Sequence, residues 1–560
     1  MSRKELYRVI IAFWIALSAA CNPAPPAAVT ATVTPTTISA GMPTDVPLPV
    51  SGCEAEEINL QDYRSVELQN PEEIASEGGI LDATLEVKYG NNHIANCPVQ
   101  LRSYNGKLVG PTLRARPGDK MILHIKNMLP PNPHGDDHGM NIPHDFNTTN
   151  LHTHGLHVSP EGISDNVLRK MPPPAAGASE ADYEVVIDIP ADHPAGTFWY
   201  HPHVHGSTAM QVSSGMAGAL IIEGGLDEAQ EIAAAEEKIF VLQQIAYDTG
   251  GKIESFETSL GFKQWEELGR HHTINGQLFP TLTMRPGELQ RWRLIHAGIE
   301  ETIEATLYGP GCDNPMDFDA ITRLPKNTLN EIAVDGLSLG KLDGWLHIRL
   351  EPGYRSDVLV RLERPGNYCL VDDFTAEEDS LRGEAEAGEA IARIQVTDDP
   401  LPQPMLFPKT AELAPLKPFK DITPEEITGH QTVAFCLCFV NGQLTYTVNG
   451  KEFDETQVRK LKLNAVEEWD VSVHVEPNSI VKVKTHPFHI HVNPFQVTRA
   501  GPDGKPETVW RDTFLVTSQD PNNPQRLLMR YKDFTGKFVM HCHILDHEDQ
   551  GMMEVEEVVP

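Results

Sequence analysis

The sequence lacks an excess of positive charge. It holds 45 Lys and Arg against 79 Asp and Glu among 560 residues, which gives a formal net charge of −34. Phosphate backbones and anionic lipid surfaces attract basic proteins. This balance therefore argues against nucleic acids and anionic membrane surfaces as partners.

A long hydrophobic run is also missing. Residues 9–20, "VIIAFWIALSAA", form an apolar stretch that is too short to span a bilayer. Basic residues precede it, and small residues follow, so the stretch is typical of an export signal. The following "LSAAC" resembles a bacterial lipoprotein cleavage site that would leave a lipid anchor on Cys21, whereas a plain secretory signal is the alternative. We expect a signal peptide at 1–21 and a location outside the cytoplasm, periplasmic, cell-surface or secreted.

The next segment lacks the material for a core. Residues 22–50 carry one charge and are rich in Pro, Thr and Ala, so we expect an extended tether at 22–54. Cysteine is scarce as well, with eight in the chain. Apart from Cys21 and Cys542, their pairing is left open, because connectivity cannot be read from a sequence. The CxC at Cys436 and Cys438 is compatible with a metal site, a disulfide or two buried small residues. The open set is Cys53, Cys97, Cys312, Cys369, Cys436 and Cys438.

One stretch of the sequence is repeated. "NGKLVGPTLRARPGD" begins at Asn105, "NGQLFPTLTMRPGE" begins at Asn275, and a weaker copy begins at Asn449. The copies are about 170 residues apart, which indicates a domain duplication rather than a solenoid. Each copy combines a turn dipeptide with a β-rich run.

Strong helical periodicity is scarce, and residues 228–238 are one short helical candidate. The 44 Pro and 42 Gly favour many turns, and short alternating or wholly apolar runs indicate strands. We therefore predict an all-β protein made of three similar Greek-key β-sandwich or barrel domains. Their predicted limits are 55–226, 227–400 and 401–560.

Four pairs of histidines are spaced two residues apart. Side chains alternate between the faces of a strand, so each HxH pair projects two imidazoles from one face. A single pair is often a surface accident, but four pairs predict eight imidazoles around a cluster of metal ions. The pairs are His152 and His154, His201 and His203, His489 and His491, and His541 and His543.

A second ligand set lies between and beside these histidines. Cys542 separates His541 from His543, so on a strand it points to the opposite face. His486 precedes His489 at an odd spacing, which also favours the opposite face. His547 and Met552 follow the strand and can fold back. Two imidazoles, a thiolate and a thioether form the set that selects a blue, type 1 copper.

Together the motifs resemble those of three-domain multicopper oxidases of the laccase type, over essentially residues 55–560. The resemblance implies three cupredoxin-like domains and four copper ions, with ligands from the first and third domains only. Residues 227–400 accordingly contain no HxH pair. The implied ligands are His152 and His489 for the type 2 copper; His154, His201 and His543 for one type 3 copper; His203, His491 and His541 for the other; and His486, Cys542, His547 and Met552 for the type 1 copper.

The resemblance implies a copper-dependent oxidoreductase with O₂ as its acceptor. A small reducing substrate would give single electrons to the type 1 copper through an exposed His486 or His547, and the trinuclear cluster would reduce O₂ to water. Glu548 resembles a proton-donating Glu of some bacterial members, and Asp165 resembles the acid downstream of the first HxHG motif. For both acids the alternative is a solvated surface carboxylate. Asp512, in "VWRDTF", is assigned no role.

The resemblance leaves the substrate open, and other copper-binding functions have to be weighed against it. Phenols or aromatic amines are the first choice of substrate, since the 15 Met form no Met-rich run of the kind that cuprous oxidases often carry. Oxidation of cuprous or ferrous ions is the alternative. A non-catalytic copper-binding scaffold ranks lower, because all twelve ligand positions are filled. A copper nitrite reductase is disfavoured, because such an enzyme lacks the His-Cys-His relay.

Overall fold

The computed structural model describes residues 65–94, 97–132, 139–248, 250–260, 270–440, 442–476 and 483–560. The expected signal peptide, the tether, Cys21 and Cys53 lie outside these residues. Among the described helices, none is long and apolar enough to cross a membrane. Strands account for 46% of the protein and helices for 7%, so the prediction of an all-β fold is confirmed. The helices are η1 (Gly225–Glu228), η2 (Ala414–Leu416), η3 (Pro424–Glu426), α2 (Thr208–Ser213), α3 (Gln230–Ala233), α4 (Phe256–Ser259), α5 (Phe318–Ile321), α6 (Thr410–Leu413) and α7 (Leu545–Asp549).

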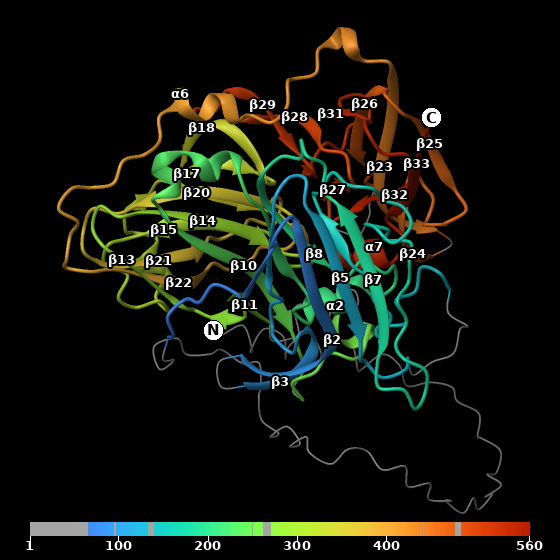
Figure 1. Ribbon diagram of the computed structural model, residues 1–560, viewed down its shortest axis with the longest axis horizontal. Helices are drawn as coiled ribbons and strands as arrows, with labels where there is room; N and C mark the ends of the chain where they lie inside the picture. The colour runs from blue at the N-terminus through green and yellow to red at the C-terminus, as the bar shows by residue number, and fades with distance from the viewer. Residues whose placement is uncertain are drawn as a thin grey trace, which may run out of the picture. The chain divides into compact units, whose positions relative to one another are not determined.

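The described strands form six sheets, which fall into three pairs along the chain (Figure 1). In the first pair the strand orders are β1-β4-β9-β8-β6 and β3-β2-β5-β7. Apolar side chains of both sheets, such as Leu123 and Phe198, share one buried core. The strands are β1 (Glu73–Ala75), β2 (Ile80–Ile94), β3 (Cys97–Tyr104), β4 (Thr112–Ala115), β5 (Lys120–Asn127), β6 (His152–His154), β7 (Ala181–Asp188), β8 (Gly196–His201) and β9 (Gly218–Ile222).

The second pair has the orders β12-β11-β10-β14-β20-β17-β18 and β13-β22-β21-β15-β16, with β19 paired to β15. Trp292 and Leu370 lie in the core that the two sheets share. The strands are β10 (Glu236–Ala246), β11 (Arg270–Ile274), β12 (Gln277–Leu278), β13 (Thr281–Met284), β14 (Leu289–His296), β15 (Ile303–Tyr308), β16 (Lys326–Asn327), β17 (Leu329–Val334), β18 (Leu337–Trp345), β19 (Ile348–Leu350), β20 (Arg355–Arg361), β21 (Gly366–Asp372) and β22 (Glu389–Val396).

The third pair has the orders β24-β23-β26-β31-β28-β29 and β25-β33-β32-β27-β30. Its core contains Trp469 and Phe538 from the two sheets. The predicted domain limits stay a prediction. The strands are β23 (Gly429–Val440), β24 (Gln443–Val448), β25 (Val458–Lys462), β26 (Val466–Val473), β27 (His486–Ile490), β28 (Phe495–Ala500), β29 (Pro506–Arg511), β30 (Thr513–Val516), β31 (Gln525–Arg530), β32 (Gly536–Cys542) and β33 (Met553–Val559).

The repeated Asn-Gly dipeptide occupies the same place in all three pairs. Asn105, Asn275 and Asn449 have φ of 53°, 56° and 52°, and the glycine after each also has positive φ. Consecutive residues of positive φ favour Asn followed by Gly. The Asn side chain accepts a hydrogen bond at 2.8–2.9 Å from a backbone N–H of β2, β10 or β23. The repeat is therefore one turn used three times.

The helical candidate at 228–238 is only partly correct. Helix α3 covers one turn, and β10 already begins at Glu236. Glu236 pairs with Gln290 of β14, and the apolar residues that follow it in β10 are buried. Pairing within the sheet thus overrides the helical propensity of the Ala- and Glu-rich segment.

Candidate metal centre

Eight histidines of the HxH pairs meet in one buried cluster. Strand β6 pairs with β8 so that His152 lies opposite His201, and β27 pairs with β32 so that His489 lies opposite His541. All eight are at most 2% exposed. The three pairs of sheets are called the first, second and third strand groups below. In the first and in the third group, sheet pairing brings together histidines from two segments that are far apart in the sequence.

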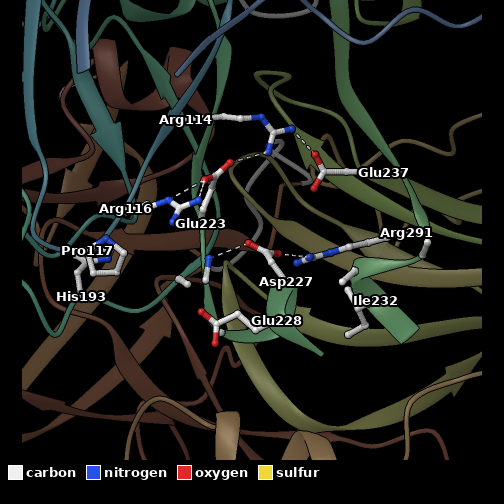
Figure 2. Close-up of a pocket in the computed structure, with 15 residues that line it drawn as sticks. Arg114, Arg116, Pro117, His193, Glu223, Asp227, Glu228, Ile232, Glu237 and Arg291 are labelled. Carbon is white, nitrogen blue, oxygen red and sulfur yellow. Dashed lines mark hydrogen bonds and ion pairs between the residues drawn. The ribbon is translucent and has the colours of Figure 1, made fainter. Parts of the chain in front are cut away.

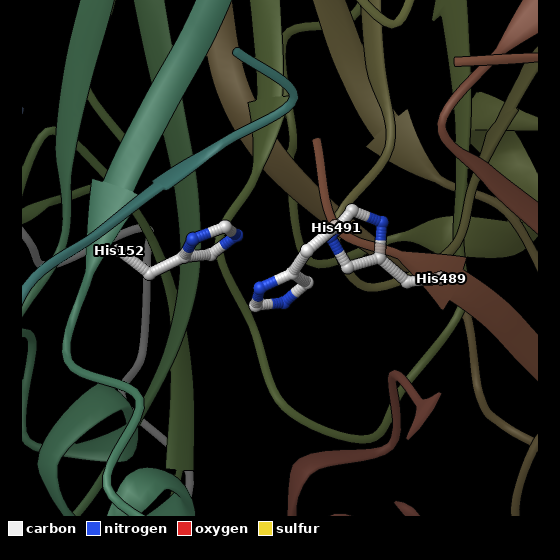
Figure 3. A group of neighbouring side chains, drawn as sticks. All are labelled: His152, His489 and His491. Carbon is white, nitrogen blue, oxygen red and sulfur yellow. The ribbon is translucent and has the colours of Figure 1, made fainter. Parts of the chain in front are cut away.

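Ring contacts join the two groups. The imidazoles of His152 and His491 stack with 3.9 Å between their centroids, as do those of His154 and His489. Figure 3 shows His152 pointing toward His489 and His491 from the opposite side of the cluster. Ligand nitrogens of these three residues lie within 4.8 Å of one another.

Only one HxH pair lies wholly on a strand, contrary to the expectation for all four. His203 follows the end of β8 and is separated from His201 by Pro202, which cannot donate to a sheet. His491 follows β27, and His543 follows β32. The second members of three pairs are therefore placed by the chain as it leaves the sheet, and they still reach the cluster.

Open ring nitrogens show that this cluster fits metal ions. The Nδ1–H groups of His201, His489 and His541 donate to backbone carbonyls at 2.8–2.9 Å. A protonated Nδ1 leaves the lone pair on Nε2, which is how metal-binding histidines are held. Nε2 of His201 and of His489 is buried without a hydrogen-bond partner among the described residues. Burial lowers the pKa of His201 to about 3, so its ring is neutral at pH 7.

The second predicted set also comes together. Nδ1 of His486 lies 3.4 Å and Nδ1 of His547 lies 3.8 Å from Sγ of Cys542. Met552 is fully buried in the same core cluster as Cys542, and its carbonyl accepts the N–H of Cys542 at 3.1 Å. The prediction of an exposed His486 or His547 is wrong for both residues, because Phe435 and the core cover His486, and His547 is buried with 5% of its surface exposed.

Asp165 is a buried neighbour of the cluster and not a surface acid. Both of its carboxylate oxygens lie 3.1 Å from Nδ1 of His152. The backbone N–H and the hydroxyl of Thr153 donate to it as well. Burial raises the pKa of Asp165 to about 7, although the bonds from Thr153 act in the opposite direction.

Glu548 is fully buried between two histidines of the cluster. One carboxylate oxygen lies 3.3 Å from Nδ1 of His203, and the other lies 3.3 Å from Nδ1 of His541. Burial, and then the neighbouring Asp549, raise the pKa of Glu548, while a hydrogen bond from Thr208 lowers it. A buried carboxyl group that touches two ring nitrogens can hold a proton at the cluster.

The second strand group supplies residues that the sequence did not reveal. Arg355, at the start of β20, donates to both carboxylate oxygens of Asp512. Asp512 in turn contacts Nε2 of His154 at 3.2 Å, and its carbonyl accepts Nδ1–H of His489. Gly353 has φ of 88°, and a Cβ there would lie 3.0 Å from Nε2 of His543. In the sequence, the segment "VWRDTF" was the one feature that pointed to this region. It contains Asp512, to which the sequence assigned no role.

A pocket outside the eight-histidine cluster has His193 among its lining residues (Figure 2). It has a volume of about 920 Å³ and is lined by residues of the first two strand groups. Its arginines all have carboxylate partners: Arg114 pairs with Glu237, Arg116 with Glu223, and Arg291 with Asp227. Each guanidinium that lines the pocket is therefore paired with a carboxylate.

Comparison with known proteins decides the family. A family model described as multicopper oxidase matches residues 417–560, and a second with the same description matches residues 86–226. Together the two matches cover about half of the chain. The chain belongs to the multicopper oxidase family.

Similar proteins carry related names. A multicopper oxidase (mco) of Staphylococcus aureus is 26% identical and covers 80% of this chain and 82% of its own length. A laccase of Bacillus stratosphericus is 23% identical over 82% of this chain and 91% of that protein. The solved multicopper oxidase of Campylobacter jejuni, described as a metallo-oxidase, has the same fold, with a TM-score of 0.65 and 22% identity over 91% of this chain and 98% of that protein.

Membership of the family makes this multicopper oxidase a copper-dependent oxidoreductase that uses O₂ and a reducing substrate. The prediction of copper as the cofactor is confirmed at this level. The copper-ligand positions predicted from the sequence fall into two neighbouring groups in the described chain: eight cluster histidines, and the Cys542 set.

Proposed function

We propose that this multicopper oxidase couples the one-electron oxidation of phenols or aromatic amines to the four-electron reduction of O₂ to water. The observation that supports this most is the placement of Cys542. Its sulfur lies among His486 and His547, while His541 and His543 on either side of it enter the eight-histidine cluster. One peptide segment thus spans both ligand sets.

Four copper ions would occupy the two sets. His486, Cys542, His547 and Met552 would hold the type 1 ion, and the eight cluster histidines would hold one type 2 and two type 3 ions. When bound, copper supplies the one-electron transfers and the reduction of O₂. The orphaned Nε2 atoms described above are compatible with this occupancy.

The chain's own residues do the remaining work. His547 is the more exposed of the two imidazoles beside Cys542, so its edge is where a reducing substrate would approach. Reduction of O₂ to water consumes protons, and Glu548 and Asp165 would hold them at carboxylate oxygens 3.1–3.3 Å from cluster histidines. The buried surroundings exclude bulk water and keep both carboxyl groups in place.

Oxidation of cuprous or ferrous ions is the second candidate. The ring of Tyr446 lies 5.2 Å from that of His547. After burial itself, the carboxylates of Asp546 and Glu300 raise the pKa of Tyr446, so both acids lie near the electron-entry edge. Burial and the neighbouring Glu300 raise the pKa of Asp546, so a metal cation would bind its carboxyl group by displacing the proton. The absence of a Met-rich run still favours organic substrates.

Kinetic measurements with each kind of substrate test the choice between organic compounds and metal ions. Oxygen consumption is measured with a methoxyphenol and with Cu(I), for the copper-loaded protein and for Asp546→Asn. A higher kcat/KM for the phenol, unaffected by Asp546→Asn, supports the first candidate. A higher value for Cu(I) that falls in the variant overturns it in favour of the second. An inert, copper-loaded protein would instead point to a non-catalytic scaffold.

We also propose that the protein works outside the cytoplasm, on a lipid anchor at Cys21. The support is the pattern of residues 1–21 alone. Cell fractionation with radiolabelled palmitate is the test. Label in the wild type and none in Cys21→Ser is expected, whereas unlabelled, fully secreted protein would favour the plain secretory signal.

A further inference from the structure

Two cysteines lie on the outer face of the third strand group. Cys436 and Cys438 belong to β23, and they form a disulfide in the structure. Between and before them, Phe435 and Leu437 point into the core. Because side chains alternate along a strand, both sulfurs point away from that core.

A histidine of the neighbouring strand lies beside them. Strand β26 runs parallel to β23, with Val473 opposite Phe435, and the N–H of His474 donates to the carbonyl of Phe435 at 2.7 Å. The next residues in register are His474 and Cys436. The two sulfurs and a ring nitrogen of His474 accordingly lie within 4.8 Å of one another. His474 is exposed, Cys438 is half-buried and Cys436 is buried, so an ion from solvent would enter the group past His474.

The Cys436–Cys438 disulfide contributes little as a structural link. A disulfide restricts the unfolded chain less when the loop that it closes is short. This one closes a loop with a sequence separation of 2, against 57 for the buried Cys312–Cys369 disulfide. Strand β24 already pairs with β23 at both cysteines. Thiol chemistry explains the pair better than stabilisation does.

We propose that Cys436, Cys438 and His474 bind one soft metal ion, Cu(I), when the disulfide is reduced. Thiolate ligands select Cu(I) or zinc, and structural zinc takes four protein ligands where this group supplies three. A dithiol reductant breaks the S–S bond, gives two electrons and two protons to the sulfurs, and itself becomes a disulfide. Binding of Cu(I) then releases the two thiol protons.

The proposed Cu(I) site lies close to the predicted type 1 copper site. Phe435, on the opposite face of the same strand, has its ring 5.7 Å from that of His486. The outer site therefore lies across one strand from the predicted type 1 site. Because the disulfide and the ion-bound thiolates exclude each other, the site holds copper only in its reduced form.

Anaerobic titration of the full-length, copper-loaded protein tests the proposal. The protein is reduced with dithiothreitol, desalted and titrated with Cu(I) buffered by bicinchoninate. The reduced protein is expected to take up one more Cu(I) per chain than the oxidised protein. The double variant Cys436→Ser, Cys438→Ser loses that ion, and His474→Ala binds it more weakly. Thr445→Ala, beside Cys438 on β24, is the matched control and keeps it.

Three outcomes would overturn the proposal: no extra uptake by the reduced wild type, equal uptake by the oxidised protein, or unchanged uptake by the serine variant. Preferential binding of Zn(II) over Cu(I) would overturn the choice of ion. Circular dichroism verifies that each variant is folded. Should the double variant fail to fold, the single variant Cys438→Ser answers the same question, because one remaining thiolate cannot hold the ion with two sulfurs.

Discussion

Arg355 offers a sharp test of how the second strand group supports the copper centre. Its guanidinium donates to the carboxylate of Asp512 and to the carbonyls of Gly353, Thr197 and Asp335. It is fully buried, so no water can replace it. Arg355→Met keeps the length of the side chain and removes the charge, which leaves the carboxylate of Asp512 buried without its main partner.

Arg355→Met is expected to lower both the stability of the fold and the affinity for copper. Breaking a buried ion pair by removing one partner costs about 3–5 kcal/mol of unfolding free energy. For a domain of this size that lowers the melting temperature by roughly 6–20 °C. Asp512 also orients His154 and His489. Loss of such a partner weakens metal binding by about 10–100-fold, so the variant should release copper to a chelator more readily.

Differential scanning calorimetry and copper retention against a chelator series measure both effects. Arg116→Met is the matched control, because Arg116 pairs with Glu223 at 3.1 Å with its side chain 70% exposed, and such pairs contribute little. If Arg355→Met had the same melting temperature as the control and kept its copper equally well, the argument that the second strand group positions the centre would be refuted.

Two further changes have definite expected results. Glu548→Gln should keep the blue absorbance and its stopped-flow reduction by substrate, but lower the kcat for O₂ consumption by about 10²–10⁴-fold, because the carboxyl group no longer transfers a proton; an unchanged kcat would exclude this role. Burial lowers the pKa of His272, but the carboxylates of Glu389, Asp372 and Glu301 outweigh it and raise the pKa to about 10. A raised folded-state pKa stabilises the fold fully below pH 6.5 and loses that contribution as the pH rises through 10. The melting temperature of His272→Gln should therefore lie furthest below that of the wild type near pH 6 and converge with it near pH 10; a constant difference would contradict the assignment.

Local patterns in the sequence predicted much of this centre. The two-residue spacing predicted convergence of the histidines, and the odd position of Cys542 predicted its separate partners. Strand alternation explains His152 and His154 directly. It does not explain His203, because Pro202 ends the strand before it, yet the cluster still receives its ring.

Other parts depend on contacts between distant segments. Arg355 precedes Asp512 by 157 residues, and no local pattern connects an arginine at a strand end with a histidine cluster. Glu548 likewise contacts His203 of the first strand group and His541 of the third, whereas the partners of Asp165, His152 and Thr153, belong to its own group. The sequence contexts of the two acids were equally compatible with surface acids, so the sequence alone left that choice open.

The central claim is that Cys542 holds one copper ion while the histidines beside it hold others. The most direct measurement is an absorbance spectrum with copper analysis, for the wild type and for Cys542→Ser. The wild type should bind four copper ions and show a thiolate band near the red and a near-ultraviolet shoulder. The variant should lose the red band and dye oxidation but keep the shoulder and most of its copper. A red band that persists without the thiol, or loss of all copper together, would contradict the account.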